Sequence, residues 1–389
     1  MTQHQIILTA MERVMAGYPA AEAVAQEAER RAASRVFLLT SGSLARNTDE
    51  VETIARALGA RLAGRFSAMP AHSPRDAVIA CAAAARSVDA DLLVTVGGGS
   101  VTDGGKAVTI CLRHDVTDMD GLDMFRTRVD ADGVRHLPDY AGPTVRQVAV
   151  PTTLSGGEFN ARAGITDPRP RLKQSYMHPG IIPVSVILDG AITRHTPEWL
   201  FLSTGIRAVD HAVETFLSID ANDYWDSSAL HALRLLGEAL PRVRLDPDDT
   251  EARQKCLVGA WLSMTGVVSG CRLGASHAIG HILGGSAGVP HGHTSCVMLP
   301  VVLDWNRPVN GRRQAELSTA LGRPGIPAAE VIGDLISGLG LPRRLGDVGV
   351  RAERLPELAA NCMLDDWTFS NPRPIRSPDQ VQEILTRAL

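Results

Sequence analysis

The stretch Asp91–Val108, DLLVTVGGGSVTDGGKAV, decides the fold of the first half of this 389-residue chain. Its first residues are apolar and rich in β-branched side chains, which is typical of a buried strand, and its end is typical of a helix. Glycines between a strand and a helix let the backbone approach a pyrophosphate, and the start of the helix offers N–H groups and the positive end of its dipole. The stretch therefore predicts a dinucleotide site. A tight turn that binds nothing is the alternative.

Similar units surround this stretch. Val36–Leu39 predicts a buried strand, followed by Thr40–Leu44, a polar turn into a helix. Val148–Thr153 predicts a strand that ends in two hydroxyl groups beside the glycines, and Val184–Asp189 is the last predicted strand. Alternating strands and helices indicate an α/β domain. The glycines do not follow G-x-G-x-x-G, so the common dinucleotide-binding fold is not expected.

After residue 196 the sequence predicts helices alone. They cover Trp199–Leu217, Asp226–Leu240, Thr250–Ser269 and the segment around His277. We therefore expect an α/β dinucleotide-binding domain over residues 1–196 and an all-helical catalytic domain over residues 197–389. Residues 113–146 are charged and have no clean period, and we expect a surface insertion or lid there.

Composition narrows the class of partner. The chain is 44% hydrophobic and 21% charged, with a formal net charge of −4 and no strong cluster of Lys or Arg. These values argue against a nucleic-acid or membrane partner and favour a small molecule. The six cysteines are scattered without a C-x-x-C pair, and neither a leader nor a long apolar run is evident. We therefore expect a soluble, cytoplasmic protein with reduced thiols.

Four histidines stand within seventeen residues, beginning at His277. His277 and His281 are four apart and share one face of a helix. Gly284–Gly285 is predicted to end that helix, and Pro290–Gly292 is predicted to be a tight turn that brings back His291. Converging imidazoles can bind a metal or transfer protons. Ordinary helix and loop histidines are the alternative.

Several motifs in order along nearly the whole chain resemble a known family. They are Gly97-Gly98-Gly99-Ser100-x-x-Asp103-x-x-Lys106, Pro151-Thr152-Thr153, His211-Ala212-Val213-Glu214, His277-x-x-x-His281 and Pro290-His291-Gly292. This pattern is similar to the iron-containing (group III) alcohol dehydrogenases. Ala68–Pro74, His281–Gly285 and Asn371–Pro374 look most like the maleylacetate reductase branch. The resemblance implies a dehydroquinate synthase-like fold, a cleft between an α/β and a helical domain, hydride transfer from NAD(H) or NADP(H) to a carbonyl, and a homodimer.

The resemblance also assigns nucleotide-binding residues. Gly97, Gly98, Gly99 and Ser100 fall where the family holds the pyrophosphate, and Asp103, Lys106, Thr152 and Thr153 line the same cofactor. Ser41 stands where many members have an Asp that repels a 2′-phosphate, and Arg46 follows it. We therefore expect NADPH to be accepted as well as NADH.

The metal site departs from the family pattern. The metal-binding members use an Asp and a His four apart, plus two later histidines, and the matching positions here are Arg207, His211, His277 and His291. A guanidinium about 5 Å from a divalent ion costs roughly 7 kcal/mol even at an effective dielectric near 20. We therefore expect no tightly bound iron. If a metal does bind, the resemblance implies His211, His277 and His291 as ligands.

Neighbouring carboxylates offer two further interpretations. Asp210 could replace the missing ligand, but adjacent helical residues point about 100° apart, so it would need a distorted helix. Asp210 or Glu214 could instead pair with Arg207, which would make the arginine structural. The alternative is that Arg207 binds a substrate carboxylate by a bidentate contact.

Together these observations predict an NAD(P)H-dependent reductase of a keto acid, similar to maleylacetate reductase and independent of metal. The predicted catalytic residues are His281, His277, His211 and Arg207, with His281 as proton donor. The main alternative is an iron- or zinc-dependent alcohol dehydrogenase. A cofactor-binding protein without catalysis and a lyase related to dehydroquinate synthase are the others.

Overall fold

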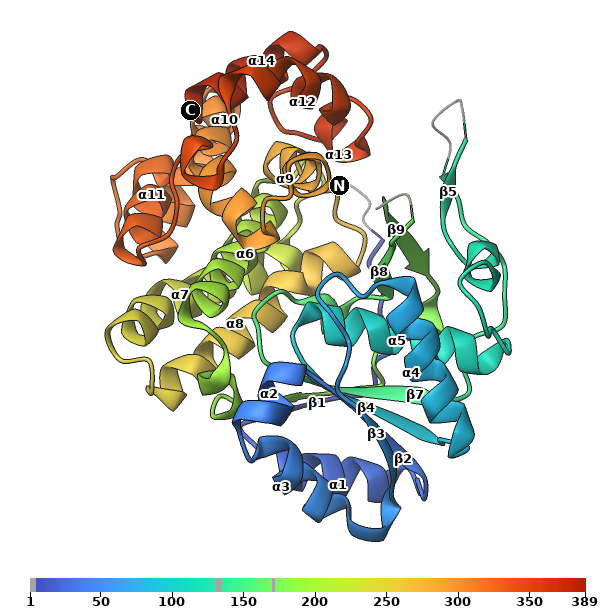
Figure 1. The fold of residues 1–389 in the computed structure, drawn as a ribbon. Coiled ribbons are helices and arrows are strands. Elements are labelled where there is room, and N and C mark those ends of the chain that lie inside the picture. The colour runs from blue at the N-terminus through green and yellow to red at the C-terminus, as the bar shows by residue number, and fades with distance from the viewer. Residues whose placement is uncertain (1–4, 131–134, 170–171) are drawn as a thin grey trace. The chain divides into compact units, whose positions relative to one another are not determined.

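The computed structural model describes residues 5–130, 135–169 and 172–389 (Figure 1). They form two compact units. One is Thr9–His195, and the other contains Thr196–Leu389 with the described residues up to Leu8. The first is built of strands and helices and the second of helices, so the predicted fold class is confirmed.

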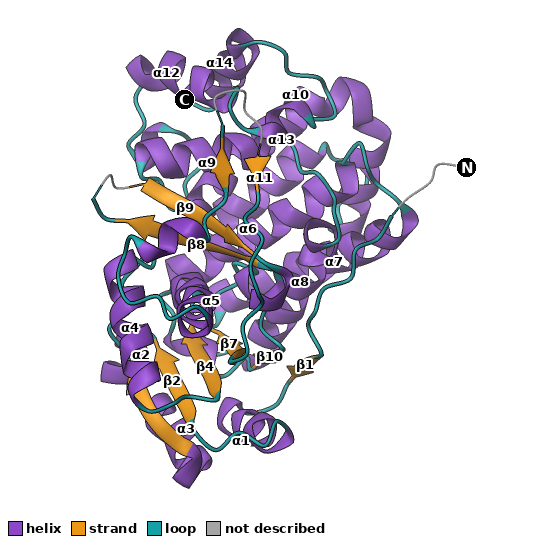
Figure 2. Cartoon of the chain, turned by 90° about the vertical axis from the view of Figure 1, so that its right-hand side faces the viewer, coloured by secondary structure: helices purple, strands orange, loops and turns teal. Residues whose placement is uncertain are grey.

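A six-stranded parallel sheet forms the centre of the first unit, with the strand order β1-β10-β7-β4-β2-β3 (Figure 2). The strands are β1 Arg13–Ala16, β2 Val36–Thr40, β3 Leu62–Phe66, β4 Leu92–Gly97, β7 Arg146–Pro151 and β10 Ser185–Leu188. The four inner strands are those that the sequence predicts. The two edge strands were not predicted, because neither is a run of buried apolar residues and each carries arginine, which is common at a sheet edge.

Alternating side chains cover the two faces of this sheet. Leu38, Val94 and Val148 belong to one apolar cluster, and Phe37 and Leu93 belong to the other. This follows from the two-residue period of a strand. Helices pack on both clusters. They are α1 Ala20–Arg30, α2 Gly42–Asn47, α3 Glu50–Leu58, α4 Arg75–Ser87 and α5 Gly99–Arg113.

Two small antiparallel hairpins extend this unit. They are β5 Arg128–Val129 with β6 Arg135–His136, and β8 Arg162–Asp167 with β9 Leu172–Met177. The first lies in segment 113–146, the predicted insertion or lid, of which residues 131–134 lie outside the described residues. Leu122 and Phe125 of this segment are buried in the core. The fully buried Arg75 also donates to the Met119 carbonyl at 2.8 Å, so the part of the segment around residues 119–125 is anchored to the core.

The second unit consists of helices. They are α6 Glu198–Leu217, α7 Asp223–Leu245, α8 Thr250–Val268, α9 Ala275–Ala287, α10 His291–Ala320, α11 Ala328–Gly338, α12 Leu355–Cys362, α13 Asp366–Phe369 and α14 Pro378–Arg387. Apolar residues of α9, α10, α12 and α14 share one core cluster. No helix among the described residues combines the length and the hydropathy needed to cross a bilayer.

Two local predictions at the histidine segment are wrong. Helix α9 does not end at Gly284–Gly285 but continues to Ala287, and its C-cap is Gly288, whose φ of +68° is left-handed. A Cβ on Gly284 would lie 2.9 Å from Cε1 of His291, so this glycine serves close packing. Pro290 is not part of an isolated tight turn, because it is the N-cap residue of α10, which begins at His291.

Candidate functional site

The glycine stretch forms the turn between β4 and α5 (Figure 1). Gly97 has a φ of +158°, and a Cβ on it would lie 2.8 Å from Cγ2 of Val101. A Cβ on Gly98 would lie 3.0 Å from Cγ2 of Thr153. Gly98 is also the N-cap residue and has no side chain with which to cap the first N–H groups of α5. This backbone turn is therefore suited to an anionic group such as a pyrophosphate.

Hydroxyl groups surround this turn. The Ser100 hydroxyl accepts the N–H of His72 at 2.9 Å. Thr152 and Thr153 follow β7 and are buried, and the Thr153 hydroxyl lies 3.3 Å from that of Ser155. The end of β7 therefore lies beside the glycine turn, as the sequence predicts.

The ammonium group of Lys106 is enclosed by protein oxygens. It donates to the carbonyl oxygens of Gly157 at 2.6 Å and Arg162 at 2.7 Å, and it lies 3.3 Å from Oδ1 of Asp103. Oδ2 of Asp103 accepts the N–H of Gly164 at 3.0 Å. Complete burial lowers the pKa of Lys106. Lys106 and Asp103 thus hold α5 against the segment around β8.

Ser41 follows β2 and is the N-cap residue of α2. Its hydroxyl lies 2.8 Å from that of Ser43. A Cβ on Gly42 would lie 3.0 Å from NH1 of Arg46, so the guanidinium folds back over this turn. Two hydroxyls and a cation therefore stand together at the end of β2.

In the helical unit, α6 presents ionisable side chains from a buried surface. Every residue of the segment 201–217 is buried. The ionisable ones are Arg207, Asp210, His211 and Glu214. Buried charges are stable only when other groups pair with them, so their contacts define what the site can do.

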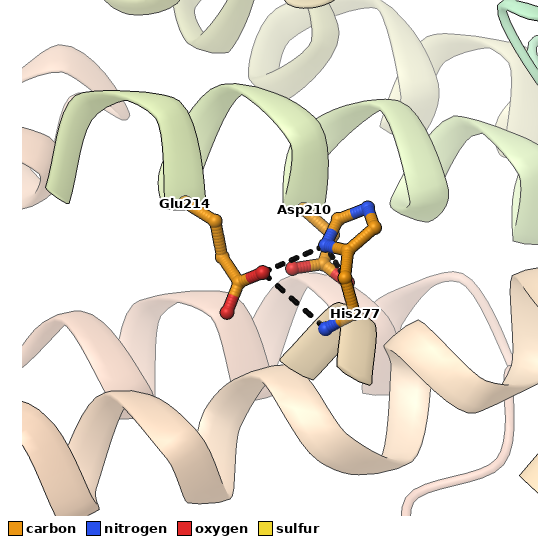
Figure 3. A group of neighbouring side chains, drawn as sticks. All are labelled: Asp210, Glu214 and His277. Atoms are coloured by element: carbon orange, nitrogen blue, oxygen red, sulfur yellow. Dashed lines mark hydrogen bonds and ion pairs between the residues drawn. The ribbon is translucent and has the colours of Figure 1, made fainter. Parts of the chain in front are cut away.

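Glu214 holds His277 (Figure 3). Its oxygens accept the backbone N–H groups of Gly274 at 3.0 Å, Ser276 at 2.9 Å and His277 at 3.3 Å, and Nδ1 of His277 lies 2.8 Å from Oε2. Burial and then the nearby Asp210 raise the pKa of Glu214, while the backbone N–H donors oppose that shift. Oε2 of Glu214 already accepts two backbone N–H groups, so we assign the proton to Nδ1 of His277, which leaves Nε2 as the acceptor nitrogen.

Asp210 is the partner of Arg207, at the i, i+3 spacing that the sequence suggested. The two charged groups lie 3.9 Å apart. The hydroxyl of Ser295 joins them, because it accepts from Arg207 at 3.1 Å and donates to Asp210 at 2.7 Å. Ser276 donates to the same Asp210 oxygen at 2.9 Å. The Arg207 side chain is 10% exposed. It is therefore anchored by Ser295 and Asp210 but still reaches solvent.

His211, His277, His291 and Arg207 gather in one place. The rings of His211 and His277 stack with their centroids 4.8 Å apart. Among the described residues, neither Nδ1 of His211 nor Nε2 of His277 has a hydrogen-bond partner. Burial and then the charge of Arg207 hold the pKa of both imidazoles well below its usual range. After burial and Arg207, His211 and His291 also lower the pKa of His277, so the other three side chains all lie within electrostatic range of His277.

His281 has its own carboxylate. Its Nδ1 lies 2.8 Å from Oδ2 of Asp365, and its ring is tilted by 31° over that of Trp367, with centroids 5.2 Å apart. The His281 side chain is 30% exposed, whereas that of His277 is 1% exposed. The two imidazoles on one face of α9 are thus each held by a carboxyl group at Nδ1, but only that of His281 is accessible to solvent.

Sequence reasoning missed the partners of both imidazoles. Glu214 was considered only as a partner for Arg207, although it lies in the quoted motif with His211. Asp365 was not considered at all. A carboxylate 84 positions from its histidine leaves no local pattern, and only the fold brings the two together.

Comparisons with known proteins agree over most of the chain. Residues 12–190 match the family model "Iron-containing alcohol dehydrogenase", and residues 201–389 match "Fe-containing alcohol dehydrogenase family, C-terminal". A maleylacetate reductase from Rhizobium sp. is 30% identical over 98% of this chain and 97% of its own. A probable alcohol dehydrogenase of Escherichia coli is 32% identical over 75% of this chain and 72% of its own. The crystal structure of maleylacetate reductase from Agrobacterium tumefaciens is 29% identical, covers 100% of this chain and 99% of its own, and has a TM-score of 0.83.

Proposed function

The chain belongs to the iron-containing alcohol dehydrogenase family and is an oxidoreductase, and we propose that it reduces the carbonyl group of a keto acid with NADH or NADPH without a metal ion. The observation that carries this proposal is Arg207. It stands at the position that the family pattern gives to a carboxylate ligand, and it lies buried beside the site imidazoles. A fixed positive charge suits an anionic substrate and opposes a cation.

The residues present do not suit a divalent cation. Arg207 lowers the pKa of His211 and His277, which means that it disfavours positive charge at both imidazoles. A metal bound to the same nitrogens would meet the same repulsion. Three neutral imidazoles without a carboxylate would have to overcome it.

The carboxylates nearby do not replace the missing ligand. Atoms of Asp210, Glu214 and His277 lie within 4.8 Å of one another, which is close enough to enclose an ion. However, Glu214 already accepts three backbone N–H groups and the imidazole of His277. One oxygen of Asp210 accepts two hydroxyls and faces Arg207. Oδ1 of Asp210 has no hydrogen-bond partner among the described residues, but an ion that also took Glu214 and His277 as ligands would disturb the bonds of Glu214, and each buried donor left unpaired costs about 1–3 kcal/mol.

The substrate carboxylate is assigned to Arg207. A guanidinium binds a carboxylate through two parallel, charge-assisted hydrogen bonds. NH1 of Arg207 is fixed by Ser295, so the planar group is oriented before a ligand arrives, and 10% of the side chain remains exposed. This fixed orientation reduces the entropy lost on binding.

The nucleotide is assigned to the glycine turn. The close approach of Gly98 to Thr153 leaves no room for a side chain, and the backbone N–H groups at the start of α5 favour a pyrophosphate. Ser41, Ser43 and Arg46 at the end of β2 would accept a 2′-phosphate, which supports the use of NADPH as well as NADH. When bound, the nicotinamide supplies the hydride that the carbonyl carbon receives.

The protein then has to manage the charge that develops on the carbonyl oxygen. As the carbonyl carbon gains hydride, the π electrons move to oxygen, and a proton from His281 completes the hydroxyl group. His281 is the better donor, because His277 and His211 are buried and held neutral. Arg207 holds the substrate in place and favours the negative charge in the transition state.

Paired substrates test the proposal. We would compare maleylacetate and 4-oxopentanoate with 2-pentanone, which lacks the carboxylate, for the wild-type enzyme and Arg207→Lys. The lysine keeps the charge beside Asp210 but loses the planar fork, so kcat/KM for the acids should fall by about tenfold or more while that for the ketone stays within about twofold. An equal loss for acid and ketone, or a wild-type preference for the ketone, would contradict the proposal.

A metal-dependent alcohol dehydrogenase is the second candidate. The observation in its favour is the pair of buried imidazole nitrogens on His211 and His277 that have no partner among the described residues. Such nitrogens are available to a metal as they stand. Removal of metal decides between the two candidates, as described below.

A further inference from the structure

Two histidine–carboxylate pairs occupy one face of α9. His277 pairs with Glu214 and His281 pairs with Asp365, each through Nδ1 at 2.8 Å. The first pair is sealed in the core. In the second, the His281 side chain is 30% exposed and that of Asp365 is 20% exposed. Only the second pair is open to a substrate or to solvent.

The carboxylate of Asp365 is fixed on both of its oxygens. Oδ1 accepts the N–H of Trp367 at 3.0 Å, because Asp365 is the N-cap residue of α13. Oδ2 faces Nδ1 of His281. The cap therefore sets the direction of the oxygen that meets the imidazole.

The same short turn also holds the face of the ring. The indole of Trp367 lies against His281 with a centroid distance of 5.2 Å. Asp365 constrains the edge of the imidazole and Trp367 constrains its plane, so α13 fixes the ring in two directions. A residue that acts by transferring a proton benefits from such fixation, because small errors in position cost much of the rate.

We infer that Asp365 is a positioning residue that keeps the proton of the neutral His281 ring on Nδ1 and thereby makes Nε2 the nitrogen that delivers a proton to the substrate oxygen. After delivery, Nε2 is left as the acceptor that takes up the next proton, while Nδ1–H remains bound to Oδ2. Asp365 itself neither gains nor loses a proton. This inference rests on the proposed function, in which His281 is the proton donor.

Asp365→Asn separates positioning from capping. The asparagine oxygen can still accept the Trp367 N–H, but its amide group would then face Nδ1 as a donor and force the opposite tautomer. We expect kcat to fall by about 100-fold or more, with KM changed much less, and the melting temperature to stay close to that of wild type. Asp249→Asn is the matched control. Asp249 caps α8 through the N–H of Ala252 at 2.9 Å and should change kcat by less than about twofold.

A double-mutant cycle shows whether Asp365 acts through His281. In a His281→Gln background, Asp365→Asn should have almost no further effect on kcat, because the ring it positions is gone. If the substitution lowers kcat by the same factor in both backgrounds, Asp365 acts on the fold or on another group and the inference is wrong.

A second readout does not depend on activity. The side-chain ¹⁵N shifts of His281, assigned by comparison with His281→Gln, should show the neutral ring protonated on Nδ1 in the wild type and on Nε2 in Asp365→Asn. The same tautomer in both proteins would overturn the inference. If the wild type reduces no keto acid but the tautomer does switch, the proposed function fails while the positioning by Asp365 stands.

Discussion

The glycine turn and the imidazole cluster are built in opposite ways. The turn consists of consecutive residues, and its chemistry comes from backbone N–H groups and from the absence of side chains at Gly97 and Gly98. The cluster consists of ionisable side chains from separate helices, and its contacts join residues 63 and 84 positions apart. A phosphate site can thus be encoded locally, whereas a site for a reacting carbonyl depends on the whole helical unit.

The difference has an energetic side. Backbone N–H groups at a helix end are neutral and present in every helix, so the turn needs only space. Buried ionisable groups need partners, and the removal of one partner leaves the other exposed to the full cost of desolvation. Substitutions at the turn should therefore mainly weaken ligand binding, whereas substitutions in the cluster should mainly lower the stability of the protein.

Glu214→Ala should have the largest effect. It removes the buried acceptor of three backbone N–H groups and of the His277 ring. We expect a loss of at least about 3 kcal/mol in the free energy of unfolding, measured with urea. Glu357→Ala is the control, because its pair with Arg354 is exposed and should be worth less than about 1 kcal/mol. A similar small loss for both would mean that buried pairing does not hold the cluster together.

Metal removal tests the same region in a second way. We expect the wild-type activity to survive chelation and dialysis, and we expect Zn²⁺ not to raise the melting temperature. Arg207→Asp restores the carboxylate of the family pattern, so Zn²⁺ should now stabilise the protein by a shift that grows with the logarithm of its concentration. Loss of wild-type activity on chelation, with recovery on adding iron, would establish the metal-dependent alternative.

The contrast between the regions also explains what the sequence could predict. The strands from Val36 and Leu92 and the turn at Gly97 carry local patterns of apolar runs and glycines, and they are present as predicted. The end of α9 was predicted wrongly at Gly284, because a glycine that makes room for His291 looks the same in sequence as one that ends a helix. The motif histidines could be listed from the resemblance. Their carboxylate partners could not, since pairing across α6, α9 and α13 depends on packing.

At the glycine turn, Gly98→Ala should weaken nucleotide binding with little loss of stability. The new Cβ would lie 3.0 Å from Cγ2 of Thr153, so the turn must shift by a few tenths of an ångström. We expect KM for the nucleotide to rise about tenfold, which corresponds to about 1.4 kcal/mol. Thr153→Ser removes that methyl group, and adding it to Gly98→Ala should recover much of the affinity. An unchanged KM in the single variant would show that the nucleotide does not approach this backbone.

Glu158 narrows the contrast between the two regions, because it places a costly buried carboxyl group in the α/β unit as well. Burial raises the pKa of Glu158 from 4.5 to about 7, although Lys106 opposes the shift. Between these values the unfolded chain has released a proton that the folded chain keeps, so each pH unit lowers the free energy of unfolding by up to about 1.4 kcal/mol.

Glu158→Gln removes this dependence of stability on pH. Its melting temperature should exceed that of the wild type by a few degrees at pH 7.5 and by much less at pH 5. The same difference at both pH values would mean that burial does not raise the pKa of Glu158, and that the α/β unit holds this carboxylate at little cost.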